Sequence, residues 1–162
     1  GFGSSKTAIV MTEHLNLEGK DIIIVRYAEE YEHSNPQTIV DKCHSLYTKH
    51  LNTLFWVDGS NRAGINLLKV SFDESLNWET SDISPEIMRI LPVNFQIEHK
   101  KMLSHLHVMV NKQYLAIPKE HDKLITSLRT AYATEYSLNK DQTSYNDLLD
   151  ALRLSLKGYN IK

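Results

Sequence analysis

The sequence predicts an α/β domain in which an antiparallel hairpin opens a mixed sheet. Two β-rich apolar runs separated by a turn lie near the start, and an amphipathic helix followed by a third apolar run comes next. Apolar residues make up 41% of the 162 positions and occur along the whole chain, which disfavours disorder. The length fits one domain covering residues 1–162.

The hairpin is the first element. Thr7–Thr12 is apolar and β-rich, and Asp21–Tyr27 is an almost continuous apolar run, as in a strand buried on both faces. The residues Glu18-Gly19-Lys20 between them have turn character. We therefore expect two antiparallel strands.

A helix and a third strand follow the hairpin. Ser34-Asn35-Pro36 supplies a cap and a proline suited to the first helical position. Apolar residues then recur at helical spacing: Ile39, Val40, Cys43, Leu46, Tyr47 and Leu51. Thr53–Val57 is the next short apolar strand. This order predicts an α/β fold with a right-handed crossover.

The rest of the chain is predominantly helical. We expect a helix over Ala63–Val70, a polar loop over Asp73–Pro85 and a strand over Met88–Phe95, with Pro92 marking an edge or the strand's end. Three closing helices carry apolar stripes at Met102, Leu103, Leu106, Met109 and Val110, then at Leu124, Ile125, Leu128 and Tyr132, then at Leu148, Leu149, Leu152 and Leu156. The last one is expected to begin near Ser144 and to end near Gly158.

Composition excludes several classes of protein. Eighteen basic against 20 acidic residues give a net charge of −2, so no overall basic charge indicates nucleic-acid binding, although a local basic face is compatible with it. Cys43 is the single cysteine, which excludes an intrachain disulfide and a cysteine-based zinc site and fits a reducing compartment. No apolar run approaches the length of a membrane span.

The last helix carries two acids on one face. Asp147 and Asp150 are three residues apart, and mutual repulsion of their carboxylates would be relieved by a divalent cation with oxygen ligands. The alternative is structural, because Ser144 with Asp147 resembles a capping box and acids stabilise a helix N-terminus. Both interpretations stand for this pair alone.

A third acid lies at the end of a predicted strand. Asp58 follows Thr53–Val57 and precedes Gly59, and sites in open α/β sheets lie at the carboxyl ends of strands. The alternative is an ordinary Asp-Gly turn. Asp58 together with the helical pair predicts a two-metal site that would activate water against a phosphodiester.

Several segments in this order resemble the nuclease domain of terminase large subunits, particularly archaeal and phage-like members. They are TLFWVDGSNRAG, ILPVNF before a His-Lys-Lys helix, YLAIP before KLITSLRTAY, and SYNDLLDALRLSL, of which NDLLDAL is the most specific. The resemblance covers most of the chain. It implies a ribonuclease H-like mixed sheet with helices on both faces.

The resemblance also implies an activity and partners. Family members cut concatemeric double-stranded viral DNA during packaging, using two Mg²⁺ or Mn²⁺ ions held by acids. By position, Asp58 matches the acid that ends the fourth strand and Asp147 the acid that opens the last helix, and the nearby Asp150 is counted with them as a catalytic and metal-holding acid. An ATPase domain, a portal and a small terminase subunit would be partners, in the cytoplasm of a host cell.

One part of the family's pattern lies outside this sequence. The family's first acid ends a central strand, and Gly1-Phe2-Gly3-Ser4-Ser5 resembles the segment directly after that acid, so the acid and its strand would precede residue 1. No P-loop pattern occurs, so the ATPase domain is absent. The chain alone is therefore expected to be an inefficient enzyme.

DNA contacts are expected from exposed cations. Arg62, Lys100 and Lys101 are the main candidates, with Lys69, His99 and Lys119 beside them, although each also suits a solvated surface. His105 and His107 point apart on a helix and predict no metal pair. Two other functions remain open: another ribonuclease H-like nuclease, such as a junction resolvase or transposase-type enzyme, and a non-catalytic DNA-binding or assembly module.

Overall fold

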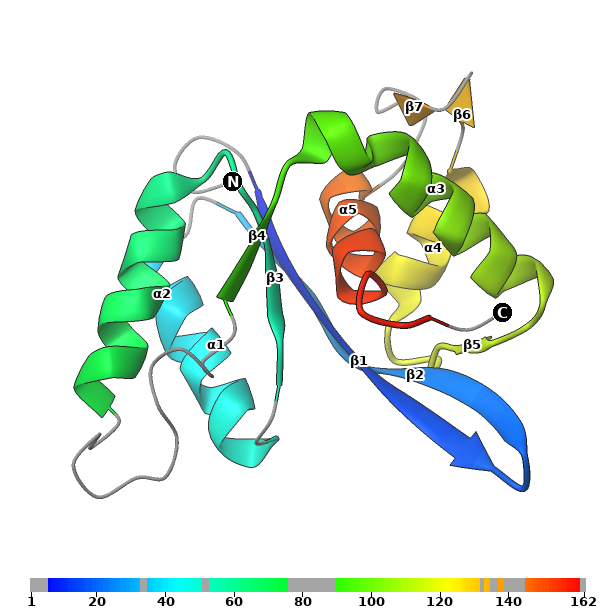
Figure 1. Ribbon diagram of the computed structural model, residues 1–162, viewed down its shortest axis with the longest axis horizontal. Coiled ribbons are helices and arrows are strands. Elements are labelled where there is room, and N and C mark those ends of the chain that lie inside the picture. Colours follow the sequence, from blue (N-terminus) through cyan, green and yellow to red (C-terminus); the bar gives the residue numbers. More distant parts are fainter. Residues whose placement is uncertain are drawn as a thin grey trace. The chain divides into compact units, whose positions relative to one another are not determined.

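The chain forms two compact units in a computed structural model (Figure 1). One comprises Gly1–Lys6 and Glu32–Phe95, and the other comprises Thr7–Tyr31 and Gln96–Lys162. The structure describes residues 6–32, 35–50, 53–75, 90–131, 133–134, 137–138 and 145–160. The expectations for Leu51, Tyr132, Ser144 and most of Asp73–Pro85 therefore lie outside the described residues. The single domain over 1–162 stays a prediction.

A hairpin of two long strands opens the second unit. β1 (Thr7–Leu17) pairs antiparallel with β2 (Lys20–Tyr31), with a register irregularity between Met11 and Thr12. Glu18 and Gly19 both have positive φ, 53° and 83°, which is the backbone of a two-residue hairpin turn that matches strand twist. The predicted antiparallel hairpin is confirmed.

Both strands are longer than the apolar runs that predicted them. Polar cross-strand pairs continue the ladder toward the turn: Arg26 Nε donates to Glu13 Oε2 at 2.9 Å, and His14 Nε2 lies 2.9 Å from Asp21 Oδ1. The predicted burial on both faces of β2 holds only in part, because Ile23 and Val25 are fully buried while Arg26 is exposed.

A short third strand completes this sheet. β5 (Leu115–Ala116) lies parallel to β2, giving the order β1-β2-β5. The antiparallel and parallel pairings together make the sheet mixed, as predicted.

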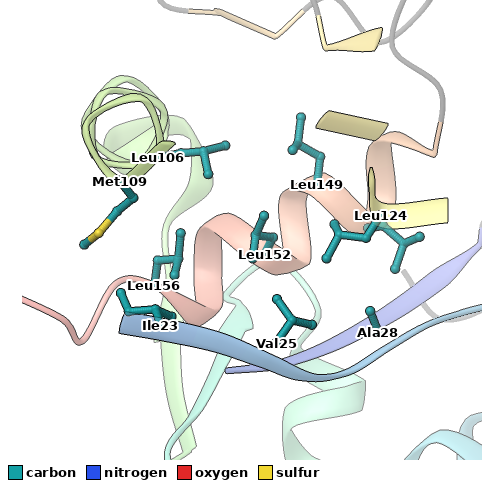
Figure 2. Packing of buried hydrophobic residues seen from close by; sticks show 10 residues of the cluster. Ile23, Val25, Ala28, Leu106, Met109, Leu124, Leu149, Leu152 and Leu156 are labelled. Carbon is teal, nitrogen blue, oxygen red and sulfur yellow. The ribbon is translucent and has the colours of Figure 1, made fainter. Parts of the chain in front are cut away.

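Three helices follow in the same unit: α3 (Phe95–Asn111), α4 (Asp122–Thr130) and α5 (Asn146–Ser155). Their core joins Ile23, Val25 and Ala28 of β2 to Leu106 and Met109 of α3, Leu124 of α4, and Leu148, Leu149, Leu152 and Leu156 of the α5 segment. Figure 2 shows α5 over β2, with Val25 and Ala28 of the strand directed toward the helix. Burial of these leucines confirms the predicted apolar side of the last helix.

Two expectations for the helices were wrong. Val110 was assigned to the apolar stripe of α3 but is 44% exposed, because the buried face follows Met102, Leu106 and Met109. Gly158 was expected to cap the last helix, but Leu156 is the C-cap, in right-handed conformation. The cap's N–H bonds back to helix carbonyls, so no glycine is needed there.

The first unit contains a parallel strand–helix–strand arrangement. α1 (Pro36–Lys49) begins after Asn35, whose side chain accepts the N–H of Gln37, as predicted from the cap and proline. β3 (Phe55–Asp58) pairs in parallel with β4 (Ile90–Val93), and α2 (Arg62–Ser75) lies between them in the chain. Among described residues β4 pairs with β3 alone, so Pro92 lies on an edge, as predicted.

The core of this unit is aromatic. Phe72 of α2 lies within 5.2 Å, between ring centroids, of both Tyr47 of α1 and Phe55 of β3. Phe72 lies beyond the predicted end of its helix at Val70, so the expected loop from Asp73 was wrong at its start. Burial raises the pKa of Cys43 to about 12, which leaves that thiol protonated and unreactive at neutral pH.

Two short strands, β6 (Ala133–Thr134) and β7 (Ser137–Leu138), form an antiparallel pair of their own. In the described part of the chain, no helix has the length and apolar character needed to cross a bilayer.

Candidate metal and DNA site

Asp58 ends β3 in a hydrogen-bonded turn. Its Oδ1 accepts the backbone N–H of Ser60 at 3.0 Å and the Ser60 hydroxyl at 2.9 Å, and its carbonyl accepts the N–H of Asn61 at 3.1 Å. Such a side-chain turn is what the structural interpretation of Asp58 predicts. It also fixes the direction of the carboxylate at the carboxyl end of β3, which a ligand site would require.

The glycine after Asp58 lets two strand ends approach closely. Gly59 donates its N–H to the Val93 carbonyl at 2.7 Å, and a Cβ on Gly59 would lie 3.0 Å from that oxygen. Any side chain would therefore press on the backbone of β4. Glycine at this position is explained by the close approach of the backbones that carry Asp58.

α2 starts directly after this turn and presents cations. Asn61 caps it by accepting the N–H of Gly64 at 3.1 Å, and Arg62 is its first residue. Arg62 and Lys69 are both exposed and lie two turns apart on one face. This arrangement allows the phosphate contacts predicted for Arg62 and equally allows a solvated face.

Asp147 lies half-buried in the first turn of α5. The residue before the helix, Tyr145, has left-handed conformation and makes no capping hydrogen bond through its side chain. Its carbonyl accepts the hydroxyl of buried Ser127 at 3.0 Å, which ties the start of α5 to α4. Ser144, the other half of the suggested capping box, lies outside the described residues.

Asp150 is engaged with an arginine that sequence reasoning missed. Arg153 pairs with Asp150 Oδ1 one turn along α5, and its side chain is 0% exposed. The signal in the sequence was an Asp and an Arg three residues apart, the spacing of a helical ion pair. Arg153 therefore relieves the charge of one of the two helical acids.

Arg153 also contacts α3. Its Nη1 lies 3.3 Å from His99 Nδ1 and 3.5 Å from the His99 carbonyl oxygen. The His99 ring, one of the residues considered for phosphate contacts, is thus half-buried against an arginine rather than directed outward. Lys100 and Lys101, which follow it, are exposed as a DNA-contacting role requires.

The other two histidines of α3 differ in exposure. His107 is exposed, while His105 is half-buried, and burial is the main cause that lowers the pKa of the His105 ring. Within neither unit do the described residues include a group of three or more His, Cys, Asp or Glu side chains placed to hold a metal. Asp58 belongs to one unit, and Asp147 and Asp150 belong to the other, so their convergence stays a prediction.

The fold of the chain agrees with that of solved nuclease structures. Its mixed α/β fold is similar to that of a phage large terminase nuclease, as the sequence resemblance implied. The similar solved structures are of the large terminase nuclease from thermophilic phage G20c. The cobalt-bound form has a TM-score of 0.63 at 14% identity, covering 98% of this chain and 85% of that chain.

Two further structures of that nuclease agree. One has a TM-score of 0.63 at 12% identity over 98% and 86% of the two chains, and the zinc-bound form has 0.57 at 13% over 98% and 85%. No family model matches this chain, and no curated protein matches it in sequence. At these identities the similarity establishes the fold.

Proposed function

We propose that this chain is the metal-dependent nuclease domain of a terminase-like packaging enzyme, cutting double-stranded DNA. The observation that carries the proposal is the agreement of the whole fold with the large terminase nuclease of phage G20c, which was solved with bound cobalt and bound zinc. An ATPase domain, a portal and a small subunit would be its partners, in the cytoplasm of a host cell.

The acids of the chain suit the proposed ions. Asp58 and Asp147 offer hard carboxylate oxygens, which Mg²⁺ and Mn²⁺ prefer. Asp58 is oriented by Ser60, which uses only Oδ1, so Oδ2 accepts no hydrogen bond from the described residues. Asp147 is at the start of a helix that α4 holds in place through Tyr145.

The proposed division of roles follows from these surroundings. Bound ions would lower the pKa of a water and stabilise the leaving oxygen of a phosphodiester. Asp58 and Asp147 would hold the ions, and Asp150 would contribute through its pairing with Arg153. Arg62, Lys100 and Lys101 would neutralise backbone phosphates, which gives affinity without sequence preference.

Plasmid nicking and Mn²⁺ binding test the proposal together. Supercoiled plasmid is incubated with Mn²⁺ and the chain extended to include the expected upstream strand, and Mn²⁺ affinity is measured separately by titration. Asp58→Asn and Asp147→Asn keep the size of each side chain and its hydrogen-bond acceptor while removing the charge. Each is expected to weaken Mn²⁺ binding and nicking by about tenfold or more, because the charge of a ligand is lost.

Matched controls separate these acids from ordinary surface acids. Asp41→Asn is the control for the first unit and Asp122→Asn for the second, since both acids are exposed on helices outside the candidate site. Unchanged binding and nicking in both site variants would remove the metal assignment. DNA binding without Mn²⁺ binding would favour the non-catalytic module, and preference for four-way junctions would favour a resolvase.

A further inference from the structure

A buried arginine lies on the polar side of α5. Arg153 is 1% exposed overall, and it is among the largest fully buried side chains in the described part of the chain. Removing a guanidinium from water costs several kcal/mol unless charged and hydrogen-bonded partners compensate. The partners of Arg153 therefore indicate why the chain keeps a charge there.

Those partners come from two helices. Asp150 of α5 supplies the opposite charge, and His99 of α3 faces Nη1 through both its ring nitrogen and its carbonyl oxygen. Arginine only donates hydrogen bonds, so His99 Nδ1 is the acceptor in this contact. The Arg153 guanidinium thus bridges the Asp150 carboxylate of α5 and the His99 residue of α3.

A second ion pair joins the same two segments. Lys157 Nζ, just after α5, lies 3.0 Å from Glu98 Oε2 on α3, next to His99 in the sequence. The Lys157 ammonium is the main cause that lowers the pKa of the Glu98 carboxyl. We name Glu98, His99, Asp150, Arg153 and Lys157 the α3–α5 clamp.

The clamp complements apolar packing. Leu149, Leu152 and Leu156 belong to the same buried cluster as Leu106 and Met109 of α3 (Figure 2). Apolar contacts are non-directional and tolerate rotation of a helix, whereas a planar guanidinium bonded to defined acceptors does not. The clamp therefore restricts rotation of α5 about its axis, which the leucines alone restrict less.

We propose that Arg153 is a positioning residue for the metal site: it neutralises Asp150 and fixes the rotation of α5 on α3, so that Asp147 is the carboxylate of α5 presented to the ion. This inference rests on the proposed function. Under this inference Asp150 acts through Arg153, and the Asp150 carboxylate is already paired with the arginine when the ion binds.

Three variants test the role of Arg153. Arg153→Met keeps most of the volume but removes the charge, while Arg153→Lys keeps the charge but lacks the fork that reaches Asp150 and His99 together. His99→Phe keeps a ring and the backbone carbonyl but removes the ring nitrogen that faces Arg153. Arg129→Met, an exposed arginine in the last turn of α4, is the control.

Two measurements are made well below each variant's unfolding temperature. Titration gives the Mn²⁺ dissociation constant, and amide hydrogen exchange gives the protection of residues 148–152. Loss of a group that orients a metal ligand typically weakens metal binding about 10- to 100-fold. We expect Arg153→Met to reach that range, Arg153→Lys to recover part of the affinity, and both to lose protection in α5, while Arg129→Met changes neither.

Each outcome decides the inference. If Arg153→Met and Arg153→Lys unfold at lower temperature yet bind Mn²⁺ like the unaltered protein, Arg153 is only structural and the inference is overturned, while the proposed function survives. If Arg153→Met does not fold, Arg153→Lys and His99→Phe decide by the same criterion. If the unaltered protein binds no Mn²⁺, the proposed function fails and the inference falls with it.

Discussion

Gly59→Ala should destabilise the first unit through one contact. The added Cβ would lie 3.0 Å from the Val93 oxygen, 3.4 Å from its carbonyl carbon and 3.5 Å from its nitrogen. These are backbone atoms of β4, and the Gly59 N–H already bonds to that oxygen at 2.7 Å. No side-chain rotation can relieve the contact, so β3 and β4 have to move apart at Asp58.

The magnitude is set by two opposing terms. Overpacking costs about 1–3 kcal/mol, whereas replacing glycine by alanine restricts the unfolded chain and stabilises the protein by about 0.4–1 kcal/mol. The net loss in free energy of unfolding should centre on about 1 kcal/mol. For a chain of this length that corresponds to roughly 2–4 °C in the unfolding temperature.

Thermal unfolding followed by circular dichroism measures this effect. Lys69→Ala is the control, because Lys69 is exposed on α2 of the same unit. It should change stability by less than about 0.5 kcal/mol. A Gly59→Ala protein as stable as the unaltered one would refute the steric explanation of this glycine.

Two further predictions concern the second unit. Leu152→Ala, at 0% exposure in the core, should lower the free energy of unfolding in urea by about 2–5 kcal/mol. Ile97→Ala, at 75% exposure on α3, should change it by less than about 0.5 kcal/mol, and equal effects would contradict the burial. Asp21 should titrate below 3.8 by NMR, because hydrogen bonds from His14 and then Asn16 lower the pKa of its carboxyl. Its contribution to stability is therefore present above that unfolded value and lost as pH falls through the lower folded pKa, and His14→Ala should return the pKa toward 3.8. An unchanged pKa in His14→Ala would contradict the assigned cause.

The elements that sequence predicted well are those with local signals. The turn at Gly19, the cap at Asn35 and the leucines of α5 each depend on residues within a few positions, where periodicity and turn chemistry suffice. The ends of the hairpin strands were missed, because cross-strand partners such as Glu13 and Arg26 are polar and carry no hydrophobic alternation.

The candidate site was predictable only residue by residue. Local pattern predicted Asp58 at the end of a strand and Asp147 in the first turn of a helix, and the structure has both residues in these positions. The burial of Arg153 did not follow, because its partner His99 lies 54 residues away and an arginine between leucines resembles a solvated surface residue. Tertiary pairing of this kind leaves no periodicity to find.

The order of segments has a consequence for synthesis of the chain. The second unit joins a hairpin from the beginning of the sequence to helices from its end, and the Tyr159 hydroxyl bonds to the Thr12 carbonyl at 3.0 Å across 147 residues. At ribosomal rates of about 5–20 residues per second, the nascent hairpin waits on the order of ten seconds for these partners. Its apolar face, with Ile23 and Val25, is then exposed to chaperones and to neighbouring nascent chains, while residues 32–95 can already fold.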